Sequence, residues 1–413
     1  MAVIPRASIW PLVGLAAILL GMTVVLLLPE GRRCESVDQA GLVGIVDEIV
    51  LMPDGGFVQV GFDHVRDADW DLLVIRSNAD GSFRWAKRCG GTERDLAKTV
   101  IPRDDGGMVV VGQTRSGLAW PPGRRAPPFN AWLLSFDADG RLLWQQTYGG
   151  PVYTSSAVAS QQRDDGGYLV FGTRRSPADP LKKQPWLLRV GPEGEELWSR
   201  ILGFGSLARP RSGGLDVLAV QFSPNYYALH LARTSPEVEL LRTQISWAGD
   251  VDWSWTFRLL PRELHPDVDS LSASSIAPAR DGGYLLGGDL RIRGPRIAWI
   301  TKVDAEGHLV WRRTFDAAGG PNGAVVLPLR DGGAYLVGKT SDERGRGSFW
   351  AARVAPAGEV VWQRTFMRGT PYAATLGRGE RLVIAGIARE PDRQALLLVT
   401  PEGDASLVTL PGE

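Results

Sequence analysis

The sequence predicts an all-β protein, a seven-bladed β-propeller of four-stranded antiparallel blades preceded by one N-terminal transmembrane helix. Two turn motifs alternate along the chain, the segments between them resemble short β-strands, and one long apolar run stands near the N-terminus. Closed all-β architectures can accommodate 413 residues in one domain, so the length agrees with this fold class. Gly and Pro, 50 and 28 residues, supply many tight turns.

The first turn motif is Asp-Gly-Gly followed by an apolar run. Copies begin at Asp54, Asp105, Asp165, Asp281 and Asp331. The gap between the third and fourth copies is about twice the others, so a degenerate copy is expected near residues 223–227, and another begins at Gly377. The motif therefore predicts seven repeats.

The second motif is Gly followed four residues later by Trp, and it gives the same count. We interpret its tryptophans as docking side chains that fill the space between neighbouring blades: Trp85, Trp144, Trp198, Trp253, Trp311 and Trp362. Gly403 and Leu407 form an altered seventh copy. Trp132, Trp186, Trp299 and Trp350 are expected to play the equivalent role on the third strands. A cofactor or carbohydrate site is the alternative for these tryptophans, but regular recurrence favours the core.

Each repeat contains four β-branched and aromatic segments separated by Gly and Asp turns. In the second repeat, strands are expected at residues 95–102, 108–114, 131–137 and 141–150. The predicted blades span residues 41–91, 92–150, 151–205, 214–258, 270–316, 322–367 and 371–411. Together they form one domain, 41–413.

Residues 7–28 carry no charge and are long enough to cross a bilayer as a helix. Residues 1–6 precede this segment and a linker, 29–40, follows it. No good small-residue cleavage site follows, so an uncleaved signal anchor is favoured over a cleaved signal peptide. We expect the propeller on the extracytoplasmic side, periplasmic or exterior. There, Cys34 and Cys89 could form a disulfide; two unpaired thiols are the alternative.

Composition and motifs exclude several functions. Lys+Arg and Asp+Glu are both 46, so a globally basic nucleic-acid binder is not expected. The sequence contains no hydrolase, nucleotide-binding or zinc-protease motif, and we assign no catalytic residue. His64 and His265 are expected in loops, and the four histidines lie in different repeats without metal-ligand spacing. We therefore expect no metal and no cofactor.

The repeat pattern DGGYLVxGxT followed by WLLRxDxxGxxxWxxxYGG resembles bacterial exported or membrane-anchored β-propeller repeat proteins. Its DxxGxxxW core is distantly similar to the docking motif of quinoprotein-type propellers. The resemblance covers nearly everything after residue 40 and implies the fold. Quinoprotein enzymes typically have eight blades, a calcium site and adjacent cysteines, which this chain lacks, so the resemblance does not imply quinone chemistry.

Antiparallel blades place their connections on two faces. The turn face carries the first-to-second and third-to-fourth turns and is expected to be acidic; the loop face carries the second-to-third loops and the blade-to-blade connections. Long loops are expected there at SGLAWPPGRRAPPFN in the second blade and RSPADPLKKQP in the third. The candidate binding residues are the basic residues of the loop face: Arg115, Arg124, Arg125, Arg174, Arg175, Lys182, Lys183, Arg291, Arg293, Arg296, Arg344 and Arg346.

The sequence thus predicts a non-enzymatic, membrane-anchored binding or scaffold module. Its partner would be a protein or an anionic envelope component, held by the basic loop face. Selection of Arg for loop solubility is the alternative account of that charge. A propeller enzyme, glycan-directed or quinone-dependent, with its site at the mouth of the central channel is the alternative function.

Overall fold

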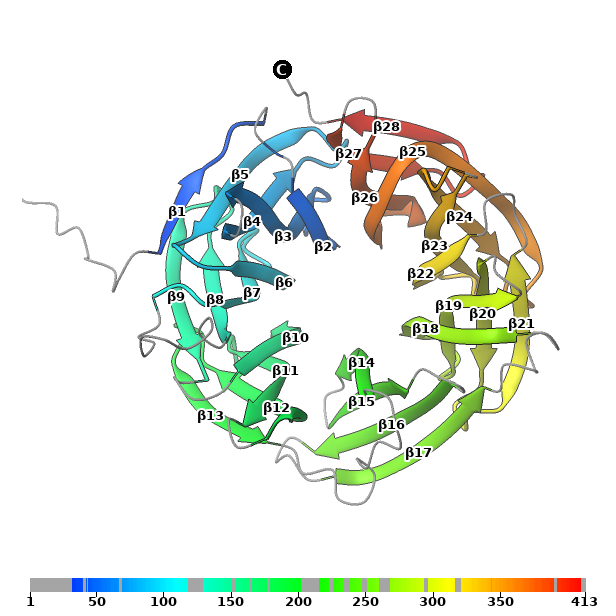
Figure 1. Cartoon of the computed structure of the whole chain (residues 1–413), viewed down its shortest axis with the longest axis horizontal. Coiled ribbons are helices and arrows are strands. Elements are labelled where there is room, and N and C mark those ends of the chain that lie inside the picture. The colour runs from blue at the N-terminus through cyan, green and yellow to red at the C-terminus, as the bar shows by residue number, and fades with distance from the viewer. Residues whose placement is uncertain are drawn as a thin grey trace, which may run out of the picture.

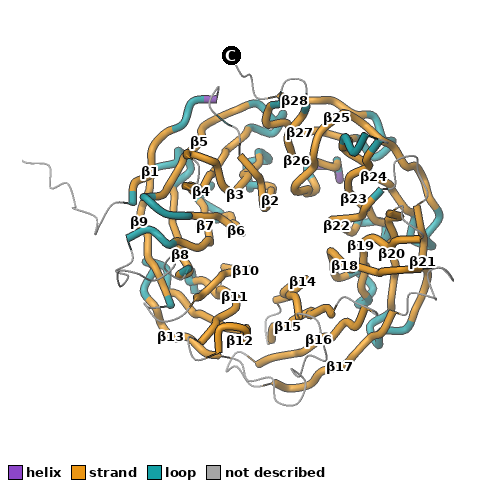
Figure 2. Tube along the Cα trace, viewed as in Figure 1, coloured by secondary structure: helices purple, strands orange, loops and turns teal. Residues whose placement is uncertain are grey.

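The computed structural model describes residues 32–409 except 40–41, 43, 67–68, 118–128, 150–153, 163–164, 177–178, 202–214, 223–225, 234–237, 247–250, 260–267, 293–295, 316–320, 343 and 390–391. Strands make up most of the described chain (Figure 2). The expected transmembrane segment, 7–28, lies outside the described residues. Among the residues that are described, no helix has the length and apolar character needed to span a membrane.

The strands form antiparallel sheets whose order in space follows their order in the chain. The first sheet has the order β1-β5-β4-β3-β2 and contains β1 (Arg33–Ser36), β2 (Gly44–Leu51), β3 (Phe57–Arg66), β4 (Asp69–Ser77) and β5 (Phe83–Gly90). The next contains β6 (Asp95–Pro102), β7 (Met108–Thr114), β8 (Asn130–Phe136) and β9 (Leu142–Tyr148). These four bounds match the strands expected for the second repeat to within two residues.

Three further sheets have four strands each. They contain β10 (Thr154–Gln162), β11 (Tyr168–Ser176), β12 (Asp179–Val190) and β13 (Glu196–Ile201); β14 (Leu215–Phe222), β15 (Tyr226–Arg233), β16 (Val238–Ser246) and β17 (Val251–Leu259); and β18 (Val268–Pro278), β19 (Tyr284–Ile292), β20 (Arg296–Val303) and β21 (Leu309–Phe315).

The last sheet consists of β22 (Asn322–Pro328), β23 (Ala334–Ser341), β24 (Gly347–Val354), β25 (Val360–Leu376), β26 (Leu382–Ala388), β27 (Arg393–Val399) and β28 (Ala405–Thr409). Its long central strand serves two meanders. Residues of β25 up to Arg368 pair with β24, and those from Gly369 onward pair with β26. A 3₁₀ turn, Arg378–Glu380, separates β25 from β26.

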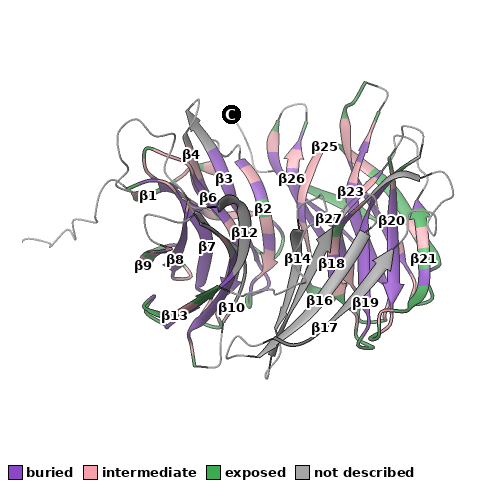
Figure 3. Ribbon diagram, turned by 60° about the horizontal axis from the view of Figure 1, so that its bottom comes forward, coloured by how far each residue is buried: buried purple, intermediate pink, exposed green. Residues whose placement is uncertain are grey.

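The sheets stand around a central axis like blades, which makes the molecule a β-propeller (Figure 1). The first strand of each four-stranded meander lies nearest the axis and the last lies at the rim. We therefore call each meander a blade and name it by its strands. Buried side chains from neighbouring blades form the core. Figure 3 shows the buried residues along the strands.

The sequence specifies the hairpins through left-handed glycines. Gly106 has φ 82°, a conformation that is cheap only for glycine, and its N–H donates to the Arg103 carbonyl. The Asp105 side chain accepts a hydrogen bond from the Gly107 N–H at 2.8 Å and so closes the same turn. The Asp-Gly-Gly motif is thus a hairpin connection between the first and second strands of a blade.

The structure differs from the sequence expectations at three places. The long loop expected in the third blade is a β-hairpin, because β11 and β12 stay paired as far as Ser176 and Asp179. The linker expected at residues 29–40 contains β1, which adds a fifth strand to the rim of the first blade by pairing with β5. His64, expected in a loop, lies within β3 opposite Trp70.

The fourth-strand tryptophans pack onto the glycine of the next blade's third-to-fourth turn. A Cβ added to Gly140 would lie 2.9 Å from the Trp85 ring, and the Trp85 indole N–H donates to the Ala138 carbonyl at 3.1 Å. Trp311 meets Gly358 in the same way and donates to the Pro356 carbonyl at 2.9 Å. In these copies of the Gly-to-Trp motif, the tryptophan of one blade packs on the turn glycine of the next blade.

The same junction recurs at two further docking tryptophans. The Trp144 ring covers Gly194, and Trp362 covers Gly403 and donates to the Pro401 carbonyl at 2.9 Å. Trp198 is half-buried beneath the guanidinium of Arg200, and Trp253 lies in β17 opposite Gln244.

The third-strand tryptophans are more deeply buried and reach back toward the preceding blade. Trp132 of β8 packs among side chains of β3 and β4, and Trp350 of β24 packs against Phe315 of β21 with ring centroids 5.3 Å apart. Trp186 and Trp299 are equally buried. Aromatic rings from both adjoining blades therefore fill the junction between the first two blades, where Trp85 and Trp132 meet.

Ring closure joins the last blade to the first without exchanging a strand among the described residues. Leu396 and Leu398 of β27 share a buried cluster with Val46 and Phe57 of the first blade. The Gln394 side chain donates to the Gly44 carbonyl across this junction.

Candidate functional site

The N-terminal strand β1 is fastened to the first blade by a disulfide between Cys34 and Cys89, which face each other in the β1–β5 pairing. Cys89 is fully buried and both cysteines of the chain are used in this bond. Arg33 lies opposite Gly90, at the end of β5 that reaches the loop face. The chain before Arg33 therefore leaves the propeller at the rim of the loop face.

The structure describes the side chains of half of the twelve candidate loop-face residues. Arg124, Arg125 and Arg293 lie outside the described residues. Arg175, Lys182 and Lys183 belong to β11 and β12, so their backbone is placed but their side chains are not described.

Two of the six described side chains make contacts within the fold. The Arg115 guanidinium lies 4.0 Å from the Phe129 ring centroid, and burial lowers its pKa. Arg174 donates to the Gly149 carbonyl at 2.6 Å and lies over the Trp186 ring. These two residues help hold the loop face together.

The remaining four described side chains are exposed. Arg296 pairs with Asp289 at 3.0 Å, and Arg346 pairs with Asp342 at 2.7 Å. Arg291 and Arg344 form no ion pair with a residue that the structure describes. The described part of the loop face is thus less strongly basic than its sequence implies, because Asp289 of β19 and Asp342 neutralise half of its exposed arginines.

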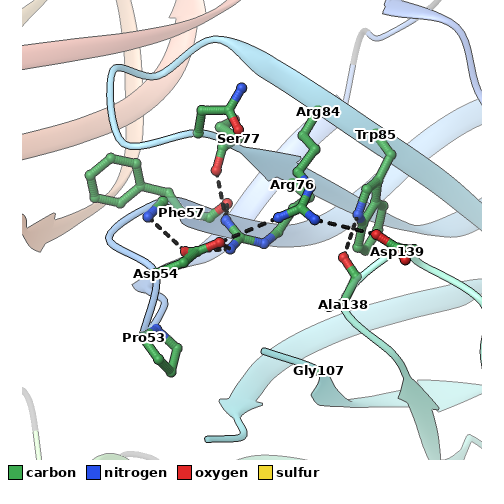
Figure 4. Close-up of polar contacts among 12 residues, drawn as sticks. Pro53, Asp54, Phe57, Arg76, Ser77, Arg84, Trp85, Gly107, Ala138 and Asp139 are labelled. Carbon is green, nitrogen blue, oxygen red and sulfur yellow. Dashed lines mark hydrogen bonds and ion pairs between the residues drawn. The ribbon is translucent and has the colours of Figure 1, made fainter. Parts of the chain in front are cut away.

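On the turn face, each Asp-Gly-Gly aspartate pairs with a basic side chain. Arg76, which is 1% exposed, holds both carboxylate oxygens of Asp54 at 2.6 Å and also donates to the Phe57 and Ser77 carbonyls. Arg84 adds a longer contact to Asp54 and another to Asp139 in the next blade (Figure 4).

The pairing repeats around the ring with the base on the third strand. The pairs are Asp165 with Arg189, Asp281 with Lys302, and Asp331 with Arg353. In the β6–β9 blade, Ser135 stands at the third-strand position and Arg103 pairs with Asp105 instead. The expectation of an acidic turn face is therefore wrong for these aspartates, because buried or half-buried bases neutralise them.

Hydrogen bonds lower the pKa of several of these carboxyl groups. A hydrogen bond from Arg103 is the main cause for Asp105, and one from Lys302 for Asp281. Burial alone would raise the pKa of Asp54, but the hydrogen bonds and charge of Arg76 lower it. Asp54, Asp105 and Asp281 are therefore held in their charged form.

Sequence reasoning missed a second feature of this face, three arginines in the first-to-second turns of consecutive meanders. Arg280, Arg330 and Arg378 line a cavity of about 580 Å³, with apolar walls from Leu51, Leu329 and Leu376 among others. The signal was present in the sequence, because Arg precedes the Asp-Gly-Gly motif in neighbouring repeats.

The innermost strands carry a β-bulge at one repeated position, and in β2 this bulge brings two acids side by side. Asp47 pairs with Lys98 at 2.6 Å. Glu48 accepts a hydrogen bond from the Val100 N–H at 2.8 Å, and burial raises its pKa to about 7 despite that bond and one from Thr99. These groups link the first blade to the second.

Metal-binding clusters are absent from the described residues: no three His, Cys, Asp or Glu side chains there are placed to hold an ion. His308 is exposed on the turn face and its ring nitrogen lies 3.1 Å from an Asp304 oxygen. His230 lies in β15, and His265 lies outside the described residues.

Comparison with known proteins finds no matching protein family and no matching curated sequence. Among solved structures, the Dos1 propeller aligns over 93% of this chain and 87% of its own, with 9% identity and a TM-score of 0.49. YCF48 from Cyanidioschyzon merolae aligns over 90% and 99%, with 11% identity and a TM-score of 0.48. A mutant of the Synechocystis apocarotenoid oxygenase aligns over 93% and 95%, with 12% identity and a TM-score of 0.46. At such identities these similarities concern overall shape and carry no function to this chain.

Proposed function

We propose that the chain is a membrane-anchored, seven-bladed β-propeller of the bacterial envelope that acts as a non-enzymatic binding or scaffold module. The seven blades are those read from the two turn motifs, with β25 shared between the last two. The loop face, presented toward the membrane, binds an anionic envelope component or an acidic protein surface.

The disulfide between Cys34 and Cys89 is the observation that carries this proposal. Disulfides form and persist in oxidising compartments, so the bond supports an extracytoplasmic location. It also supports an anchor close to the propeller rim, because only residues 29–32 separate the apolar segment from β1. Four residues span at most about 14 Å, which would hold the rim of the loop face beside the bilayer.

Arg291 and Arg344 are the described residues best suited to bind an anionic partner from this face. Both are exposed and neither forms an ion pair among the described residues. Basic side chains near an anionic lipid surface contribute about 1 kcal/mol each, so several together produce salt-dependent binding. The same charges would also steer an acidic protein.

The test is cross-linking and co-purification of the full chain from native membranes, compared with an Arg291→Glu, Arg344→Glu variant. We expect a bound lipid, polysaccharide or protein that the variant loses at low salt. The matched control is Arg141→Glu with Arg312→Glu, two exposed arginines outside the loop face. Equal recovery from both variants contradicts the loop-face site, and turnover of a sugar, ester or alcohol by the purified chain contradicts a non-enzymatic role.

A further inference from the structure

The turn face holds a second charged site, at the opposite face from the proposed loop-face surface. Arg280, Arg330 and Arg378 come from the first-to-second connections of three consecutive meanders, β18–β21, β22–β25 and β25–β28. All three are exposed and all three line the same cavity. Because the first two strands of each blade lie near the axis, this cavity lies at the inner part of the turn face (Figure 1).

The positive charge of this cavity is not neutralised by the acids beside it in the sequence. Asp281 pairs with Lys302 at 2.5 Å, and Asp331 pairs with Arg353 at 3.1 Å. Arg280 and Arg330 form no ion pair with any residue that the structure describes. The third-strand bases thus occupy the aspartates and leave the preceding arginines free to bind another anion.

One acid, Glu380, lines the cavity and offsets the charge of one of the three arginines, which leaves the cavity basic. Glu380 accepts a hydrogen bond from the Arg330 backbone N–H, which ties the 3₁₀ turn to the neighbouring blade. It does so at φ 60°, a left-handed conformation that costs a non-glycine residue free energy and persists only where the surroundings hold it. Arg378 contacts the next blade through the Pro53 carbonyl at 3.4 Å. The 3₁₀ turn is therefore held by contacts to the blade on each side of it, one through Arg330 and one through Arg378.

The remaining walls are apolar. Leu51, Leu329, Leu376 and prolines 278 and 328 line the same space. A volume of about 580 Å³ is in the range of small-molecule sites, where apolar walls enclose a ligand and a few polar groups orient it. Guanidinium groups bind carboxylate and phosphate with paired hydrogen bonds.

We infer that this cavity, the arginine cavity, binds a small organic anion with two or more carboxylate or phosphate groups and an apolar body. The inference does not rest on the loop-face proposal, since it concerns the other face and other residues. The arginines hold the anionic groups and the leucines and prolines contact the apolar part. Such a ligand bridges the blades on both sides of the shared strand β25.

The test is isothermal titration calorimetry of the full chain, kept dispersed in detergent, with three probes: benzene tricarboxylate, citrate and pyrophosphate. We expect one site, with benzene tricarboxylate binding more tightly than citrate because only the former carries an apolar ring. Binding should weaken with added salt. Absence of binding heat with all three probes overturns the inference.

Arg280→Glu with Arg330→Glu should lower the affinity for benzene tricarboxylate at least tenfold. Both side chains are exposed and form no ion pair among the described residues, so the fold should be retained. If the double variant does not fold, Arg280→Gln alone should give a smaller loss of affinity for benzene tricarboxylate. The matched control, Arg141→Glu with Arg312→Glu, also reverses two exposed charges but lines no part of the cavity and should keep full affinity. Equal affinity in the double variant and the control assigns the binding to another surface and refutes the arginine cavity.

Discussion

The contact between Trp311 and Gly358 allows a sharp test of how the blades are joined. Gly358 has φ +87°, and a Cβ placed there would lie 2.7 Å from the Trp311 ring. Trp311 is 8% exposed, so the ring has little room to retreat. Gly358→Ala therefore combines two costs: the left-handed backbone, about 1–2 kcal/mol, and overpacking, about 1–3 kcal/mol. We expect a total loss of about 2–5 kcal/mol in the free energy of unfolding.

Gly345 provides the matched control for the backbone cost. It has φ +73°, and nothing lies within 4 Å of the position its Cβ would take. Gly345→Ala should accordingly cost only about 1–2 kcal/mol. The difference between the two variants measures the steric contact with the tryptophan.

The assay is equilibrium urea unfolding followed by far-ultraviolet circular dichroism, with refolding curves to establish reversibility. A double-mutant cycle with Trp311→Ala isolates the contact, because Gly358→Ala should then cost no more than Gly345→Ala. Two results refute the reasoning: equal losses for the two glycine variants, or an excess loss at Gly358 that survives removal of the ring.

Three other predictions follow from the described contacts. Replacing Cys34 and Cys89 by Ser should lower the free energy of unfolding by about 4 kcal/mol, because the bond closes a loop with a sequence separation of 55; an unchanged urea midpoint would contradict this. Arg76→Met should cost about 3 kcal/mol at pH 7, since it leaves buried carbonyls without a donor. Part of that loss should vanish in acid, because the pKa of Asp54 is lowered in the folded state and its contribution is lost as the pH falls through that value. Glu48 has the opposite pH dependence, because its pKa is raised in the folded state from an ordinary 4.5 to about 7. The free energy of unfolding should therefore decline by about 3 kcal/mol as the pH rises through this interval. Urea titrations at pH 5 and pH 8 should show this decline in the parent chain and not in Glu48→Gln.

The sequence was most informative where local chemistry decides the structure. Left-handed glycines and Asp turns repeat at fixed places in each unit, so the strands of the β6–β9 blade could be placed within two residues. Recurrence also predicted the blade-to-blade contacts seen for Trp85, Trp144, Trp311 and Trp362. The glycines that the tryptophans contact were not predicted. Gly140, which Trp85 covers, belongs to the next repeat, and its role in the turn already accounted for its presence.

The candidate sites were harder to predict because they depend on which charged side chains form ion pairs in the folded chain. Asp54 and Arg76 are 22 residues apart and Asp165 and Arg189 are 24 apart, so only the strand register brings each pair together. Counting charges by face treated these aspartates as free. The expected long loop of the third blade failed for a related reason: its prolines and charges suggested an irregular segment, whereas β11 and β12 continue to pair.

The seam between the last and first blades has a topological consequence. Each blade is built from contiguous sequence, and among the described residues the two ends of the ring meet through side chains such as Gln394 and through the Val408 methyl groups that cover Gly81. The ring can therefore open at this junction without breaking backbone hydrogen bonds between paired strands. The propeller can therefore be circularly permuted at a boundary between separate sheets without altering a strand pairing, whereas a cut between the last two blades would interrupt β25. Under mechanical load the ring should open first at the seam between the last and first blades.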